Sequence, residues 1–154
     1  MALTQTTTLD VVGQTSVLSF YQSATLVDQV SFGSNQITFA SISSFNLSKS
    51  DLLLYIQYKI AWNNLILLNF PTILQYVNGA FPVSNFQISN TFAGVTHITF
   101  NQTSAGVTCV NINYVPTAAS CSFTAIASPV TISIQEFFMN IYMLQQYQVQ
   151  VQDN

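Results

Sequence analysis

Few residues in this 154-residue chain have the types and spacing that catalysis or metal binding requires. His97 is the only histidine and could act as a general base, but the Gly-x-Ser-x-Gly elbow of a serine hydrolase is absent. With Cys109 and Cys121, His97 supplies too few ligands, at the wrong spacing, for structural zinc. The five glycines stand apart, so no phosphate-binding loop is present. The sequence therefore predicts no catalytic, cofactor-binding or metal-binding residue and no enzyme activity.

Carboxylates and aromatic side chains leave two other kinds of site open. Asp28, Asp51 or Glu136 could meet as a carboxylate pair for glycoside hydrolysis, although isolated surface acids explain them equally well. Trp62 could form a sugar-stacking platform with neighbouring tyrosines, although aromatic residues in a central strand more often belong to the core. The tyrosines in question are Tyr55 and Tyr58.

Charge is unusually scarce. Two lysines and five acids make up 5% of the chain, against about 25% in a typical globular protein, and arginine is absent. Direct binding to nucleic acid needs several basic residues on one face, and so does holding an anionic membrane surface, so neither is expected. A surface of Ser, Thr, Asn and Gln hardly changes its charge with pH, which indicates an extracellular or acidic setting. A surface buried in a large assembly would also need few charges.

Targeting and modification signals add little. The opening MALTQTTTLD has neither a basic start nor an apolar core, so no secretory signal is predicted. The apolar zone Leu52–Phe70 contains too many polar residues for a membrane span. Cys109 and Cys121 could form a disulfide or remain core thiols. Asn46 and Asn101 match the N-glycosylation pattern, which is common by chance in such a composition.

The elements that must position these residues are mostly extended. The densest apolar stretch, Leu52–Trp62, alternates with a period of two and predicts a core strand, although Ser50 or Asp51 could cap a helix there. The predicted core comprises Leu54, Ile56, Ile60, Ile98, Phe100, Val110 and Ile112.

Turn residues divide the rest of the chain into short segments. An extended arm, residues 1–12, precedes a single domain, residues 13–154, with no internal repeat. Residues 71–79 fit a short helix or a strand ending in an Asn-Gly turn, and Ala80–Asn85 is irregular. The remaining predicted strands are Ser16–Gln22, Thr25–Phe32 with Gln36–Ile42 as a hairpin, Val95–Asn101 with Val107–Val115 as a second hairpin, Ser122–Ala127, Val130–Gln135 and Gln145–Gln152. Glu136–Leu144 has a mixed pattern.

This spacing of eight to ten strands indicates a sandwich or a barrel, with at most one or two short helices. Of the two we expect an all-β, antiparallel β-sandwich. The size, the retained Met1, the short β arm and the strand pattern resemble the single jelly-roll capsid proteins of icosahedral viruses. The near absence of charge resembles proteins of archaeal viruses from acidic hot springs.

The resemblance implies a structural subunit of a virion, an extracellular particle. Such a subunit would self-assemble with copies of itself and other coat proteins, and any membrane contact would not depend on charge. Two alternatives remain open, namely a pilin-like filament subunit joined by strand donation and a carbohydrate-binding β-sandwich module. Of the two ends, the arm is the preferred bridge between subunits over Gln145–Asn154.

Overall fold

The computed structural model describes residues 2–71, 86–93 and 97–154, with the backbone alone for residues 86–93. The described chain is mostly antiparallel β, arranged in two five-stranded sheets, with two long helices. The first sheet has the order β1-β2-β3-β4-β10 and the second the order β5-β9-β8-β7-β6. The elements are β1 (Leu3–Asp10), β2 (Thr15–Gln22), β3 (Thr25–Gly33), β4 (Gln36–Ser41), β5 (Phe45–Ser48), α1 (Lys49–Asn69), β6 (Phe86–Ala93), β7 (His97–Ser104), β8 (Val107–Val115), the 3₁₀ turn η2 (Pro116–Ala118), β9 (Ser120–Phe123), β10 (Val130–Ser133) and α3 (Ile134–Asp153).

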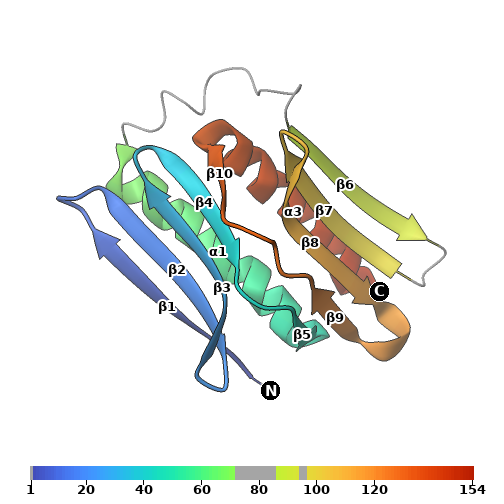
Figure 1. Cartoon of the computed structure of the whole chain (residues 1–154). Helices are drawn as coiled ribbons and strands as arrows, with labels where there is room; N and C mark the ends of the chain where they lie inside the picture. The colour runs from blue at the N-terminus through green and yellow to red at the C-terminus, as the bar shows by residue number, and fades with distance from the viewer. Residues whose placement is uncertain (1, 72–85, 94–96) are drawn as a thin grey trace.

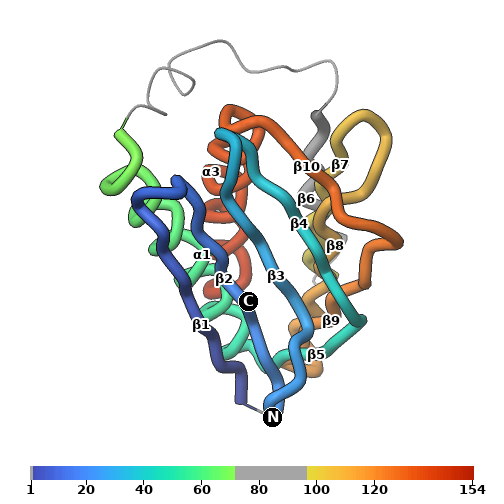
Figure 2. The backbone as a smooth tube through the Cα atoms, turned by 60° about the vertical axis from the view of Figure 1, so that its left-hand side comes forward, coloured from blue at the N-terminus to red at the C-terminus, as the bar shows by residue number. Residues whose placement is uncertain are grey.

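The two sheets lie beside each other and the two helices cover one side of them, as Figures 1 and 2 show. Helix α1 packs on β1, β2, β5 and β9, and α3 packs on β6, β7, β10 and β4. The helices also contact each other. One core therefore lies between the layer of sheets and the layer of helices.

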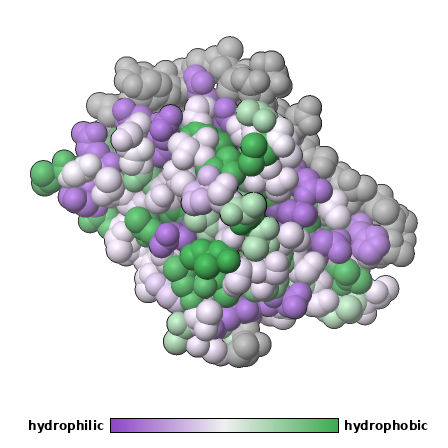
Figure 3. All heavy atoms as spheres, in the orientation of Figure 1, coloured by the Kyte–Doolittle hydropathy of each residue, from purple (hydrophilic) through white to green (hydrophobic). Residues whose placement is uncertain are grey.

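The strands alternate between this core and the outer face. In β8, Val110, Ile112 and Tyr114 are buried, whereas Asn111 and Asn113 point the other way and are half-buried. Seen from the sheet side, the surface is mostly of intermediate hydropathy, with small separate apolar and polar patches (Figure 3).

The two halves of the chain repeat one arrangement. Each half is a four-stranded meander, then a short strand that joins the edge of the other half's sheet, then a long helix. β5 thus pairs with β9, and β10 pairs with β4. The sequence has no repeat of fixed period, so this repeat is one of topology. The buried positions of the helices recur at the same spacing, with Leu52, Tyr55, Ile56, Lys59, Trp62, Asn63 and Ile66 in α1 corresponding to Phe137, Asn140, Ile141, Leu144, Tyr147, Gln148 and Val151 in α3.

Contacts between helix and sheet follow the same repeat. The Trp62 indole N–H donates to Ser16 Oγ at 2.9 Å, and the equivalent Tyr147 hydroxyl donates to the carbonyl of Ile98 at 2.9 Å. Ser16 and Ile98 are each the second residue of the second strand in their half. The first strands of the two halves, β1 and β6, lie at opposite margins of the molecule in Figure 1, and both helices lie behind the sheets.

The predicted central strand Leu52–Trp62 is wrong, because this stretch lies inside the 21-residue helix α1. Its N-cap is Ser48, whose side chain accepts from the backbone N–H of Asp51. The predicted strand Gln145–Gln152 is wrong in the same way, since it lies in the 20-residue helix α3, which also contains the mixed segment Glu136–Leu144.

Most other strand predictions are confirmed, with bounds shifted by a few residues. The β3–β4 hairpin turns at Ser34 and Asn35, which both adopt positive φ as a tight hairpin turn requires. The hairpin of β7 and β8 also forms. The predicted helix or strand at 71–79, the irregular Ala80–Asn85 and the start of Val95–Asn101 fall largely outside the described residues.

Of the predicted core, Ile56, Ile98, Phe100, Val110 and Ile112 are buried. Ile60 is partly buried and packs against the core. The prediction that Leu54 belongs to the core is wrong, because this residue of α1 has 44% of its surface exposed. The fold is thus a β-rich arrangement of two antiparallel sheets, as predicted at that level, but it carries two long helices in place of short ones, and the jelly roll is not confirmed.

Candidate functional site

The only buried charged cluster in the described residues joins β3 to α1. The Tyr55 hydroxyl donates to Asp28 Oδ2 at 2.6 Å, and both side chains are almost fully buried. One helical turn later, Lys59 is 1% exposed, with its Nζ 4.9 Å from the centre of the Phe39 ring and 5.0 Å from that of Tyr55. α1 brings Tyr55 and Lys59 to one face because residues four apart in a helix are neighbours.

Burial opposes charge on every member of this cluster. Loss of water raises the pKa of the Asp28 carboxyl, and the nearby Lys59 charge and the Tyr55 hydrogen bond offset only part of the rise. Loss of water likewise lowers the pKa of Lys59, against the opposing effect of Asp28. Burial and the adjacent Asp28 raise the pKa of Tyr55 well above its ordinary value. Such shifts are typical of functional sites, but they also occur in structural ion pairs.

Whether a substrate can reach Asp28 and Lys59 decides between a functional site and a structural contact. The cavity beside Asp28 and Lys59 measures about 10 Å³, which is room for about one water molecule. A substrate cannot reach either group in this structure. We therefore interpret the cluster as a structural contact that fixes α1 against β3.

Sequence reasoning missed this cluster. It treated Asp28 as one of several surface acids and Lys59 as a polar interruption of a strand. A usable signal was nevertheless present, because Lys59 is a lone cation in the densest apolar stretch of the chain. A charged residue in that position is almost never buried without a partner.

The residues considered for catalysis and metal binding do not come together. His97 is exposed at the start of β7. Asp51 and Glu136 lie in the first turns of two helices that begin at opposite ends of the molecule (Figure 1). Glu136 accepts a hydrogen bond from the Ser104 hydroxyl at 2.8 Å. Among the described residues, no three His, Cys, Asp or Glu side chains are grouped to hold a metal ion.

The two cysteines are free and buried, one in β8 and one in β9. Burial raises the pKa of the Cys109 thiol to about 11, and the pKa of Cys121 is raised further for the same reason. Of the two alternatives, the structure shows core thiols. Such thiols are poor nucleophiles at neutral pH.

The proposed sugar platform is not on the surface. Trp62 is 2% exposed, Tyr55 is 1% exposed and Tyr58 is partly buried against the core. The rings pack against core aromatic residues, with Trp62 edge-on to Phe137 and Tyr55 against Phe20. These aromatic residues therefore stabilise the fold and present no stacking face to a ligand.

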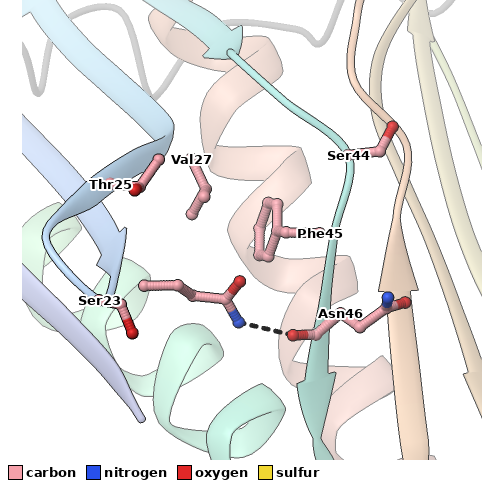
Figure 4. Close-up of a pocket in the computed structure, with 7 residues that line it drawn as sticks. Ser23, Thr25, Val27, Ser44, Phe45 and Asn46 are labelled. Atoms are coloured by element: carbon pink, nitrogen blue, oxygen red, sulfur yellow. Dashed lines mark hydrogen bonds between the residues drawn. The ribbon is translucent and has the colours of Figure 1, made fainter. Parts of the chain in front are cut away.

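An open cavity of about 520 Å³ lies between the β2–β3 turn and β5, as Figure 4 shows. Its lining carries hydroxyl and amide groups but no ionisable side chain, with Phe45 and Val27 as the apolar floor. The Gln22 side-chain amide donates to the backbone carbonyl of Asn46 at 2.6 Å, while the Asn46 side chain points away (Figure 4). An equivalent cavity of about 410 Å³ lies at the β7–β8 turn in the other half. Both can take up neutral polar groups, and neither supplies a group for catalysis.

The outer edge of the first sheet is the remaining candidate. The predicted arm forms β1, which pairs with β2 along all eight residues without a bulge. Among the described elements, β1 has no neighbour on its other side. Most of its side chains are exposed, and at the following turn Val11 is 53% and Val12 96% exposed. This edge presents free backbone donors and acceptors beside an apolar tip.

No helix in the described part of the chain is both long and apolar enough to cross a membrane. No protein-family model, curated protein or solved structure matches the chain.

Proposed function

We propose that this chain is a structural subunit that assembles with copies of itself, and that the assembly is the shell of a virus particle. The observation that carries the assembly is the unprotected edge strand β1. The viral shell rests on the sequence resemblance to capsid proteins. The jelly-roll form of that resemblance is left aside, because each sheet here is a meander completed by one exchanged strand.

Edge strands of monomeric proteins are normally protected against pairing with other chains. The usual protection is a bulge, a proline, a lysine on the edge or a very short strand. β1 has none of these, being eight residues long, regular in register and free of lysine and proline. β2–β3 and β7–β8, inside the sheets, do contain register shifts. A chain that needs its edge for assembly would keep this edge open.

The surface carries even fewer charged side chains than the composition suggests, because some of the charged residues are buried. Asp28, Lys59 and Glu136 are buried, with at most 8% of each exposed. The remaining charged side chains are Asp10, Lys49, Asp51 and Asp153. Copies of such a surface repel each other little at any pH, which favours close packing in a shell.

The test is to place a charge on the open edge. We expect Thr6→Lys to abolish assembly of the purified protein while the far-UV circular dichroism stays unchanged, because an ammonium group on the edge must lose water when a second strand pairs there. Thr117→Lys, in the exposed η2 turn, is the matched control and should assemble normally.

Electron microscopy and light scattering supply the readout. Closed particles support the shell, and filaments support the pilin-like alternative. A wild-type protein that stays monomeric at high concentration, or a Thr6→Lys variant that assembles like wild type, would refute assembly through this edge. Binding of wild type to a neutral glycan array without any assembly would favour the carbohydrate-binding alternative, for which the two open cavities are the available places.

A further inference from the structure

The repeat of the two halves gives the molecule two equivalent open edges. β1 is the outer strand of the first sheet and β6 the outer strand of the second, and each has a single neighbour within the described residues. Both strands are eight residues long. In Figure 1 they form opposite margins of the molecule, and their arrows point in opposite directions.

We infer that β1 of one copy pairs antiparallel with β6 of the next copy, so that the sheets of neighbouring subunits become continuous. This inference rests on the proposed function and names the partner of the β1 edge. A second copy placed beside the first without being turned over brings its β1 against β6, and the two strands then run antiparallel. All strand pairings among the described elements of the chain are also antiparallel.

The chemistry of the two edges is compatible. β1 has one charged residue, Asp10 at its end, and β6 has none, so no like charges oppose each other. With all eight residues paired, Thr6 lies opposite Asn90 and Thr7 opposite Ser89. Backbone hydrogen bonds would supply the contact, as in other cases of strand addition.

This pairing also accounts for the sidedness that a shell requires. Because the next copy is placed without being turned over, each added copy presents its sheets on one side and its helices on the other. A contact between two different edges repeats from copy to copy; it closes into a ring where the rotation between copies closes, and it extends as a helical filament where it does not. Pairing of β1 with β1 would stop at a dimer and leave β6 open.

Cysteine cross-linking tests the pairing in the full chain. Thr7→Cys and Ser89→Cys are made separately, mixed, allowed to assemble and oxidised gently, and Thr6→Cys with Asn90→Cys tests the neighbouring position. We expect a disulfide-linked dimer in each mixture and little or none in either variant alone. Wild type is the control for Cys109 and Cys121, whose burial should leave it without cross-links.

The outcomes separate this inference from the proposed function. Particles whose β1 variants cross-link to themselves, or that show no cross-link in any mixture, would overturn the β1–β6 pairing but leave self-assembly intact. Absence of particles in wild type and variants alike would overturn the proposed function itself. Cross-links in the mixture of Thr7→Cys and Ser89→Cys that disappear when Thr6→Lys is added to the Thr7→Cys chain would support both.

Discussion

Replacing the buried lysine tests how the Asp28–Tyr55–Lys59 cluster holds α1 against the sheet. Lys59→Met keeps an unbranched side chain over the rings of Phe39 and Tyr55 but removes the positive charge that faces buried Asp28. Breaking one partner of a buried charge pair costs about 3–5 kcal/mol, so we expect a loss of that size in the free energy of unfolding at pH 7.

The loss should depend on pH in a defined direction. The pKa of Asp28 is raised in the folded protein, so the folded state binds this proton more tightly than the unfolded chain does. Lowering the pH from 7 toward the ordinary value of 3.8 therefore adds stability, and without Lys59 this gain is larger. The loss in the free energy of unfolding caused by Lys59→Met should then shrink to about 1 kcal/mol or less near pH 4. The reason is that a protonated Asp28 is neutral and needs no counter-charge.

Urea unfolding followed by circular dichroism at pH 7 and pH 4 provides the measurement. The double variant Asp28→Asn with Lys59→Met leaves no charge in the cluster, and we expect its free energy of unfolding to lie within about 1 kcal/mol of the wild-type value or above it. Lys49→Met is the matched control, because this half-buried lysine makes only a 3.4 Å contact with the carbonyl of Gln152. Equal losses at both pH values, or a double variant as unstable as the sum of the single ones, would refute the reasoning.

Three further predictions concern the fold. Ile56→Ala should lower the free energy of unfolding by about 2–5 kcal/mol, because this side chain is fully buried in α1, and a loss under about 1 kcal/mol in urea would contradict the assignment. Ser48→Ala and Ser133→Ala remove equivalent helix caps and should each cost about 1 kcal/mol in the same assay, whereas a large inequality would argue against the equivalence of the halves. Gln102→Ala or Asn140→Ala should each lower the free energy of unfolding by about 1–3 kcal/mol. The Asn140 amide donates to Gln102 Oε1 inside the core, so removing either side chain leaves the remaining polar atom of this bond buried and unpaired. A neutral effect of both substitutions would contradict this.

The strands could be predicted from the sequence because their inward and outward positions differ in polarity. In β8, buried Val110, Ile112 and Tyr114 alternate with half-buried Asn111 and Asn113. Turn residues then marked where each strand ends, as at Ser34 and Asn35. Local rules of this kind need no knowledge of the rest of the fold.

The helices were missed because some of their polar residues are buried and some of their apolar residues are exposed. In α1, Lys59 and Asn63 are buried, whereas Leu54 and Leu68 are exposed, so the apolar residues alone show no helical stripe. α3 shows the same exchange, with Asn140 buried and Val149 exposed. Only the side chains brought by the two sheets make the buried polar groups acceptable, and those contacts are not visible in a single stretch of sequence.

The internal repeat was hidden for a related reason. At equivalent places between helix and second strand, one half uses the aromatic pair Phe20 and Tyr55, and the other half uses the amide pair Gln102 and Asn140. Position and burial are preserved while residue type is not. Self-comparison of the sequence therefore shows no period, although the topology shows one.

The exchanged strands tie the two halves together more firmly than packing alone would. Neither half completes its own sheet, since β10 follows the second meander but pairs with β4 of the first, and β5 follows the first but pairs with β9. β5, in the second sheet, leads directly into α1, which packs on the first sheet, and β10, in the first sheet, leads into α3, which packs on the second. Ser48 and Ser133 are the N-caps at these two junctions. Separating the halves would therefore expose both inner sheet edges and both helix starts at once. Within residues 2–71, 86–93 and 97–154, the edges that remain open are β1 and β6, and there the sheets can grow without disturbing the fold of the subunit.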